Sequence, residues 1–290
     1  MDNLLMDNLM KETFNYPLSI QRVELPELSQ QAVHMDVLRL DLLHPIVSGN
    51  KWYKLKEWLR LAKRTGARRI VTFGGAWSNH IIAAAFAAKE AGLSATGIIR
   101  GERPAHPSAT LTGAEAYGME LSFITRAAYK EKDDPAFLAR LAAQYPDAVI
   151  IPEGGAGEPG IIGAKDILKD IDSSAYSHIL CAVGTGTTFN GLSAAVGPDQ
   201  QVVGISVLAP PYHFGGYARH TPELLAFMNY FYRNTGIPSD FVYTGKLFYA
   251  ALDMVRRNLL PSHSRLLVIH SGGLQGNRSL APGILEFRAF

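Results

Sequence analysis

Two lysines stand at the start of a helical pattern where an amine could meet a ligand. Lys51 follows a Gly-Asn turn at 49–50, and Lys54 comes three residues later. A neutral lysine amine can form a Schiff base with an aldehyde, whereas an ammonium cannot. Burial beside Trp52 and Tyr53, together with the charge of Lys54, would lower the pKa of Lys51 and favour the neutral amine. The alternative for both lysines is an ordinary solvated position on a helix.

A glycine–threonine loop provides groups suited to an anion. Residues 184–188 read Gly-Thr-Gly-Thr-Thr, follow the apolar run 178–183 and open a helical pattern. Glycines let the backbone N–H groups approach a phosphate, and the threonine hydroxyls add donors. A dinucleotide fingerprint would need glycine at Phe189, and a P-loop would need a lysine within this turn. The loop therefore predicts a phosphate site of another kind, with a plain threonine-capped turn as the alternative.

Two further segments carry polar side chains at expected helix starts. Ser78 and Asn79 follow Gly74-Gly75 and could hold a carboxylate through backbone N–H groups and the serine hydroxyl. The alternative is a plain N-cap, and His80 beside them fits a structural residue better than a base. Tyr243 could stack on a planar ring or move a proton, whereas a packed tyrosine before a capping Thr244 is the alternative.

The composition bounds the class of protein. The chain has 290 residues, of which 47% are hydrophobic and 19% charged, so it can form one large domain or two of ordinary size. Its formal net charge of +2 is too small to indicate a nucleic-acid partner. No apolar run approaches the roughly 20 residues of a membrane span. Residues 1–10 carry acids where a signal peptide needs a basic flank, and a short helix is expected there.

The cysteine and histidine content restricts which disulfides and metal sites the chain can form. Cys181 is the single cysteine and lies in an apolar run, so the chain can form neither an internal disulfide nor a thiolate cluster. A buried, inert thiol is expected, which favours a reducing, cytoplasmic compartment. The histidines show no spacing typical of metal ligands, and we expect no metal.

The elements that must position these residues alternate along the chain. Strands are predicted at 20–23, 35–40, 70–73, 93–99, 119–124, 148–151, 178–183, 202–207 and 266–270. Helices are predicted from Trp52 to Gly66, from Ser78 to Gly92, from the glycine–threonine loop to about 196, and over 108–117, 134–145, 161–171, 222–234 and 245–258. Such alternation predicts parallel sheets flanked by helices, an α/β fold.

The glycine-bearing loops all follow predicted strands. In parallel sheets ligands bind beyond the carboxyl ends of the strands, and loops 74–79, 152–157, 184–188 and 271–273 fall there. Together they offer an amine, a row of N–H donors and several hydroxyls. We therefore expect one shared site that holds a phosphorylated aldehyde cofactor, pyridoxal 5'-phosphate (PLP).

The order of these segments resembles a known family. The matching blocks are Gly-Asn-Lys-x-x-Lys-Leu at 49–55, Gly-Gly-x-x-Ser-Asn-His at 74–80, Pro-x-Gly-Gly at 152–155, the glycine–threonine loop, Tyr-Thr-Gly-Lys at 243–246 and Gly-Gly at 272–273. They resemble the PLP-dependent 1-aminocyclopropane-1-carboxylate (ACC) deaminases and D-cysteine desulfhydrases, which have the two-domain tryptophan-synthase-β-like fold (fold type II). The resemblance implies a large cofactor-binding domain of 1–56 and 167–290, a small inserted α/β domain of 57–166, and a homodimer.

The resemblance also implies a role for each residue. Lys51 would hold the cofactor as an imine and shuttle the Cα proton, Ser78 would hold the substrate carboxylate, and Tyr243 would face the substrate as a second acid or base. The cofactor contacts would be Lys54 and the loop Gly184, Thr185, Gly186, Thr187 and Thr188 at the phosphate, Asn79 at the ring hydroxyl, and Thr244 near the pyridine nitrogen.

Departures from the family pattern bear on the reaction. ACC deaminases carry glutamate where Thr244 stands, so the chain leans towards the desulfhydrase members and towards α,β-elimination. Trp77 replaces a polar residue, Ser48 replaces a glycine, and the segment before Lys51 is shorter. The expected activity is a lyase or deaminase that releases a 2-oxo acid and ammonia from a small amino acid. The alternatives are a PLP- or anion-binding homologue without turnover, and an amino-acid racemase on the same fold.

Overall fold

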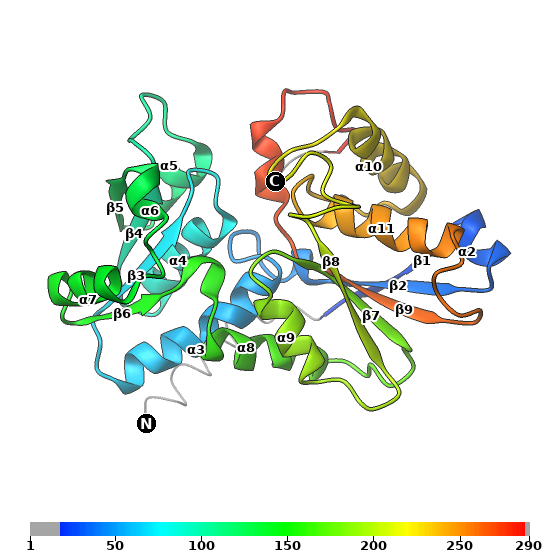
Figure 1. Ribbon diagram of the computed structural model, residues 1–290, viewed down its shortest axis with the longest axis horizontal. Helices are drawn as coiled ribbons and strands as arrows, with labels where there is room; N and C mark the ends of the chain where they lie inside the picture. The colour runs from blue at the N-terminus through cyan, green and yellow to red at the C-terminus, as the bar shows by residue number, and fades with distance from the viewer. Residues whose placement is uncertain (1–17, 288–290) are drawn as a thin grey trace. The chain divides into compact units, whose positions relative to one another are not determined.

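A computed structural model describes residues 18–287 of the chain, which form two compact units (Figure 1). The small unit comprises residues 51–163, and the large unit comprises 18–50 with 164–287. The chain thus passes between units at 50/51 and 163/164, whereas the resemblance placed these boundaries at 56/57 and 166/167. The short helix expected in residues 1–10 lies outside the described residues.

The large unit is built on one five-stranded sheet. Its strands run in the order β1 (Ile20–Val23), β2 (His34–Arg39), β9 (Arg265–His270), β7 (His178–Val183) and β8 (Gln201–Ser206). All neighbours are parallel except β1 and β2, which are antiparallel. Residues 24–33 between them form only a short helix, α2 (Pro26–Gln30), and are too few for a parallel crossover. The predicted parallel sheet therefore carries one antiparallel strand at this edge.

Helices cover both faces of this sheet (Figure 1). Helices α2, α10 (Pro222–Thr235) and α11 (Thr244–Arg256) lie on one face, and α9 (Thr187–Ser193) lies on the other. Helix α11 buries Leu247, Phe248 and Leu252, which recur at helical spacing, against sheet residues such as Val37 and Val268. This core fixes α11, whose first residues belong to the predicted site.

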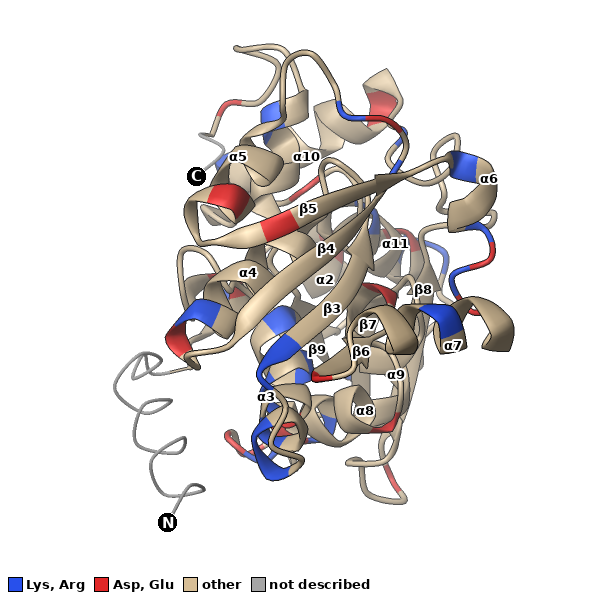
Figure 2. Ribbon diagram, turned by 90° about the vertical axis from the view of Figure 1, so that its left-hand side faces the viewer, with Lys and Arg blue, Asp and Glu red and all other residues tan. Residues whose placement is uncertain are grey.

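The small unit has a four-stranded parallel sheet. Its order is β5 (Met119–Ile124), β4 (Ser94–Arg100), β3 (Arg69–Gly74) and β6 (Ala148–Ile151). Helices α4 (Asn79–Glu90) and α5 (Ala109–Ala116) lie on one side of it, and α6 (Arg126–Tyr129) and α7 (Pro135–Gln144) lie on the other (Figure 2). Helix α5 packs closely against α4, since a Cβ on Gly113 of α5 would lie 2.7 Å from Ile82 of α4.

The remaining helices and 3-10 turns complete the described part of the chain. Helix α3 (Asn50–Arg64) opens the small unit, and α8 (Glu158–Lys165) continues as a 3-10 turn, η3 (Asp166–Leu168). The predicted helix over 161–171 therefore starts earlier and ends earlier than expected. The remaining 3-10 turns are η1 (Leu40–Leu42), η2 (Glu153–Gly155) and η4 (Leu274–Ser279). Among residues 18–287, no helix combines the length and apolar character needed to cross a bilayer.

A buried histidine ties the start of α4 to the sheet of the small unit. The Thr72 hydroxyl donates to the carbonyl oxygen of Ile151 at 2.8 Å, so it must accept from Nε2 of His80, also at 2.8 Å. His80 is therefore the neutral tautomer protonated at Nε2, and its buried Nδ1 has no hydrogen-bond partner. Burial and the charges of Lys51 and Lys54 lower the pKa of His80 to about 3.

This network makes stability depend on pH. The unfolded chain binds a proton at His80 near its ordinary pKa of 6.5, whereas the folded chain resists it down to about 3. Stability from this group is thus present above pH 6.5 and lost as the pH falls, by about 1.4 kcal/mol per unit. We expect wild type to lose about 2–3 kcal/mol more than His80→Gln between pH 6.5 and about 4.5, measured by urea unfolding.

The control is His34→Gln, because His34 is exposed at the start of β2. This variant should follow the wild-type pH curve. If His80→Gln also follows the wild-type curve, the buried neutral histidine is not the source of the pH dependence.

Candidate functional site

The Gly-Asn turn before Lys51 is held by the large unit. The Asn50 side chain donates to the Thr188 hydroxyl at 2.7 Å, and both residues are buried. Gly49 has φ +67°, and a Cβ there would lie 1.8 Å from the carbonyl oxygen of Ser271, so only glycine fits. The backbone N–H of Gly49 donates to Leu40 at 2.8 Å. The residue from which the chain continues into Lys51 is thus fixed to the glycine–threonine loop.

The glycine–threonine loop itself has the features of an anion site. Gly186 occupies the N-cap position of α9 with φ +79°, and no atom lies within 4 Å of where its Cβ would be. Thr187 and Thr188 are buried, and the Thr185 and Thr187 hydroxyls lie 3.0 Å apart. Hydroxyls and backbone N–H groups therefore surround a turn with open space above it. These donors fit the phosphate of PLP.

Two tyrosines face each other beside this loop. A Cβ on Gly184 would lie 3.2 Å from the Tyr243 ring, so the ring lies directly on the loop. The Tyr243 and Tyr217 hydroxyls are 3.4 Å apart, and their rings meet edge to face at 6.1 Å. Tyr217 is 49% exposed. It was missed in the sequence, although its Pro/Gly/aromatic loop follows β8 as the other site loops follow their strands.

Thr244 is buried and bonded to Asp240. Its hydroxyl donates to the Asp240 carboxylate at 2.7 Å and accepts from the Asp240 backbone N–H at 2.8 Å. Asp240 also accepts from the backbone N–H groups of Val242, Tyr243 and Thr244 at 2.9 Å each. Asp240, which the sequence did not single out, therefore caps α11. Towards a ligand Thr244 can only accept, and its place near a pyridine nitrogen stays a prediction.

The small unit groups the remaining predicted residues. Lys54 is buried and its amine donates to the carbonyl of Gly154 at 3.2 Å, while Lys51 is partly buried. The charges of both lysines act on His80, the third residue after Trp77. Lys54 thus contacts the Pro-Glu-Gly-Gly segment, and its role at a phosphate stays a prediction.

Ser78 and Asn79 begin α4 where the sequence placed them. Ser78 occupies the N-cap position, but its side chain makes no capping hydrogen bond, so the alternative in which its hydroxyl only caps the helix is wrong. The hydroxyl lies against Gly74, where a Cβ would be 2.8 Å away. Trp77 beside it is 46% exposed. A serine hydroxyl that the helix does not use remains available to a ligand.

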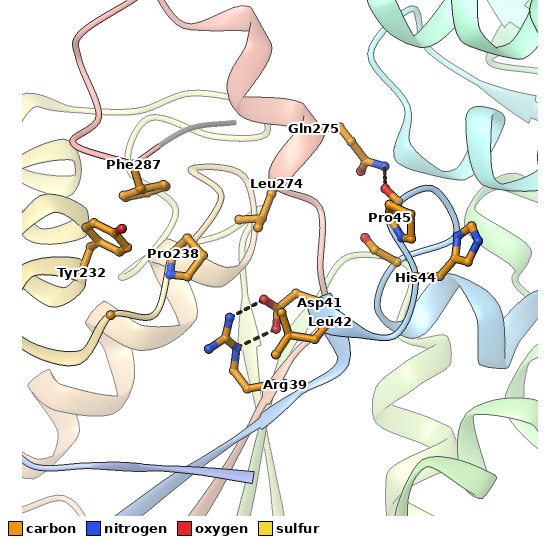
Figure 3. A pocket seen from close by; sticks show the side chains of 12 residues that line it. Arg39, Asp41, Leu42, His44, Pro45, Tyr232, Pro238, Leu274, Gln275 and Phe287 are labelled. Carbon is orange, nitrogen blue, oxygen red and sulfur yellow. Dashed lines mark hydrogen bonds and ion pairs between the residues drawn. The ribbon is translucent and has the colours of Figure 1, made fainter. Parts of the chain in front are cut away.

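A cavity of about 560 Å³ lies elsewhere in the large unit (Figure 3). Its apolar wall includes Tyr232, Leu274 and Phe287, and several of its polar groups make hydrogen bonds within the chain. Arg39 donates twice to Asp41, at 2.8 and 2.7 Å, and Gln275 donates to Ile46 at 3.2 Å. None of the predicted site residues lines this cavity.

The described residues show no sign of a metal or disulfide. No group of three or more His, Cys, Asp or Glu side chains between 18 and 287 could hold a metal ion. Cys181, the single cysteine, is buried in β7.

The predicted site residues fall in two groups. The large unit brings together Gly184, Thr185, Gly186, Thr187, Thr188, Tyr243 and Thr244, and adds Asn50 and Tyr217. The small unit holds Lys51, Lys54, Ser78 and Asn79. The roles assigned to these residues remain predictions.

Comparisons with known proteins point the same way. The chain is 29% identical to a protein of Pyrococcus abyssi provisionally named 1-aminocyclopropane-1-carboxylate deaminase, over 87% of this chain and 88% of that one. It is 25% identical to D-cysteine desulfhydrase of Yersinia pestis, over 82% and 86%. The crystal structure of an ACC deaminase homologue superposes with a TM-score of 0.79 at 25% identity, covering 94% of this chain and 95% of that one.

A more distant solved structure shares the fold, and a family model identifies the family. A serine racemase from Dictyostelium discoideum, 13% identical with a TM-score of 0.67, shares the fold over 92% of this chain and 96% of its own. The family model described as "Pyridoxal-phosphate dependent enzyme" matches residues 13–214, more than half of the chain. The chain therefore belongs to the pyridoxal-phosphate dependent enzymes of fold type II.

Proposed function

We propose that this enzyme is a lyase of the deaminase or desulfhydrase type that acts on a small amino acid and releases a 2-oxo acid and ammonia. The observation that carries the proposal is the buried hydrogen bond from Asn50 to Thr188. It ties the residue before Lys51 to the loop whose donors fit a phosphate. The names of the relatives, an ACC deaminase and a D-cysteine desulfhydrase, support the reaction class.

The residues of the chain would divide the work in the following way. Bound PLP supplies an aldehyde for the amines and an electron sink that acidifies the Cα–H bond of the substrate. Residues 184–188 bind the phosphate, Lys54 adds a positive charge, and Asn79 contacts the ring hydroxyl. Ser78 binds the substrate carboxylate through its hydroxyl, which the helix leaves unused. The Lys51 amine takes the proton from Cα.

The tyrosine pair would act at the substrate side chain. The Tyr243 hydroxyl lies 3.4 Å from that of Tyr217, so one phenol can orient the proton of the other. Elimination needs a proton at the leaving group, which Tyr243 can deliver from its position on the phosphate loop. His80 stays neutral and holds the start of α4, so it serves as a structural residue rather than a base.

We also propose a homodimer in the cytoplasm, as the resemblance and the lone cysteine predict. The buried thiol of Cys181 is compatible with a reducing compartment. Light scattering coupled to gel filtration checks the dimer directly.

The amine assignment predicts a spectroscopic change. Purified wild type saturated with PLP should show a visible absorbance band from the lysine-bound cofactor, and Lys51→Ala should lack it. Lys63→Ala, an exposed lysine in the last turn of the same helix, is the matched control and should keep the band. A colourless wild type that PLP cannot reconstitute, or a Lys51→Ala variant that keeps the band, contradicts the assignment.

The phosphate assignment predicts weaker cofactor binding. Thr188→Val removes a hydroxyl from the loop and leaves the Asn50 amide without its acceptor. A hydrogen bond to a charged group contributes about 1.5–3 kcal/mol, so we expect PLP affinity to fall about 10- to 150-fold. Absorbance titration measures the PLP affinity. The control is Thr65→Val, because Thr65 is an exposed residue directly after α3. If Thr188→Val binds PLP as tightly as wild type, the loop does not bind the cofactor phosphate.

The reaction assignment predicts which amino acids are consumed. A 2-oxo acid assay across D-cysteine, D-serine, L-serine and ACC should give product with at least one, and Tyr243→Phe should lower turnover by about 10²- to 10⁴-fold while keeping the visible band. Exchange of the α-proton with solvent without a 2-oxo acid would indicate a racemase. Binding of PLP without either reaction would indicate a homologue without turnover.

A further inference from the structure

Lys246 is a buried lysine that the proposed reaction does not use. It lies in α11, three residues after Tyr243, and its side chain is fully buried. Its amine donates to the carbonyl oxygens of His213 and Gly216 at 2.8 Å each, and lies 3.5 Å from that of Val207. All three acceptors belong to one loop, residues 207–217, which follows β8.

The ammonium and the loop depend on each other. A buried charge is tolerated only when it is paired or fully hydrogen-bonded, and three N–H donors here meet three carbonyl acceptors. Burial lowers the pKa of Lys246 to about 8, and the charge of Asp240 opposes the shift. At neutral pH the amine is therefore mainly charged and keeps all three donors.

The loop needs such a tether because its own sequence does not favour its path. Phe214 within the loop and Ala218 directly after it have φ angles of +47° and +52°, which L-residues rarely adopt. Two side chains give further contacts to α11, since the Tyr212 hydroxyl donates to Asp253 at 2.8 Å and Phe214 meets the Tyr249 ring edge to face at 4.9 Å. The three contacts run along one helix face and hold the loop against it.

The loop delivers Tyr217 to Tyr243. Gly216, which accepts from Lys246, is directly followed by Tyr217. Helix α11 carries Tyr243 at its N-cap position and Lys246 within its first turn. One helix end therefore bears one tyrosine and, through the lysine, sets the position of the other.

We infer that Lys246 is a positioning residue whose buried ammonium fastens loop 207–217 to α11 and thereby sets the Tyr217 hydroxyl against that of Tyr243. The ordering of the loop stands on the contacts alone. The consequence for turnover rests on the proposed function of the tyrosine pair.

Hydrogen exchange measured by mass spectrometry tests the ordering without any activity. Lys246→Met keeps an unbranched side chain, one atom shorter than lysine, but has no donor. We expect amides of 207–217 to exchange at least about 10-fold faster while those of α10 stay protected. Lys246→Gln, which keeps one amide donor group, should fall between Met and wild type, and it replaces the Met variant if that one does not fold. Lys130→Met, at an exposed position of the small unit, should match wild type. Unchanged exchange in the loop would overturn the inference.

A double-mutant cycle tests the consequence for catalysis. Lys246→Met should lower kcat for 2-oxo acid release by about 10-fold or more, with PLP affinity within about two-fold of wild type. In a Tyr217→Phe background the same change should cost less than about three-fold, because the hydroxyl it positions is already gone. Effects that multiply would show that Lys246 acts on the fold in general and overturn the positioning role.

The exchange experiment and the double-mutant cycle together distinguish failure of this inference from failure of the proposed function. If wild type releases no 2-oxo acid from any substrate, the proposed function fails, and the exchange experiment still decides whether Lys246 orders the loop. If wild type is active and the loop is unaffected by Lys246→Met, the inference fails and the proposed function stands.

Discussion

The hydrogen bond between Asn50 and Thr188 is the contact on which the rest of the site depends. It is short and buried, and it joins the first residue of α3 to the first turn of α9. Loss of one partner would leave a buried amide or hydroxyl unsatisfied, which costs about 1–3 kcal/mol. Gly49 makes the bond possible, because any side chain there would collide with the carbonyl of Ser271. Lys51 thus directly follows a residue that the large unit holds in place.

Buried ionisable groups place the loops around this contact, each stabilised in a different way. Asp240 stays satisfied because three backbone N–H groups and the Thr244 hydroxyl donate to it. Lys246 is satisfied by three carbonyls of one loop. His80 is kept neutral, since its buried Nδ1 has no acceptor for a second proton. In each case the polar group fixes a segment that hydrophobic packing alone would leave undetermined.

Most of the fold could be predicted because its strands are short apolar runs between turn residues. The bounds of β1, β5, β6 and β7 agree with the sequence to the residue. Helices α2 and α6 were missed, since five and four residues show no periodicity. The antiparallel pairing of β1 was missed for a related reason, because the direction of a strand depends on how far the intervening chain can reach.

The site was predictable only where a residue type carries its own chemistry. The family was confirmed, whereas the lysines, threonines and tyrosine predicted from their motifs remain predictions as site residues. Tyr217 and Asp240 act through contacts with residues distant in the chain or through backbone geometry, which no local pattern reveals. A plain N-cap was the alternative reading for the Ser78 hydroxyl, and the structure leaves this hydroxyl out of the cap.

The close approach at two glycines has a consequence for anyone who wishes to change the specificity of this enzyme. The position of a Cβ on Gly49 or Gly163 lies within 2 Å of a backbone carbonyl oxygen, of Ser271 and Tyr53 respectively. Backbone cannot swing aside as a side chain can, so any other amino acid at these positions would force the backbone to shift. Libraries for directed evolution should keep both codons constant and randomise Trp77 and Tyr217, whose exposed rings leave room for other side chains.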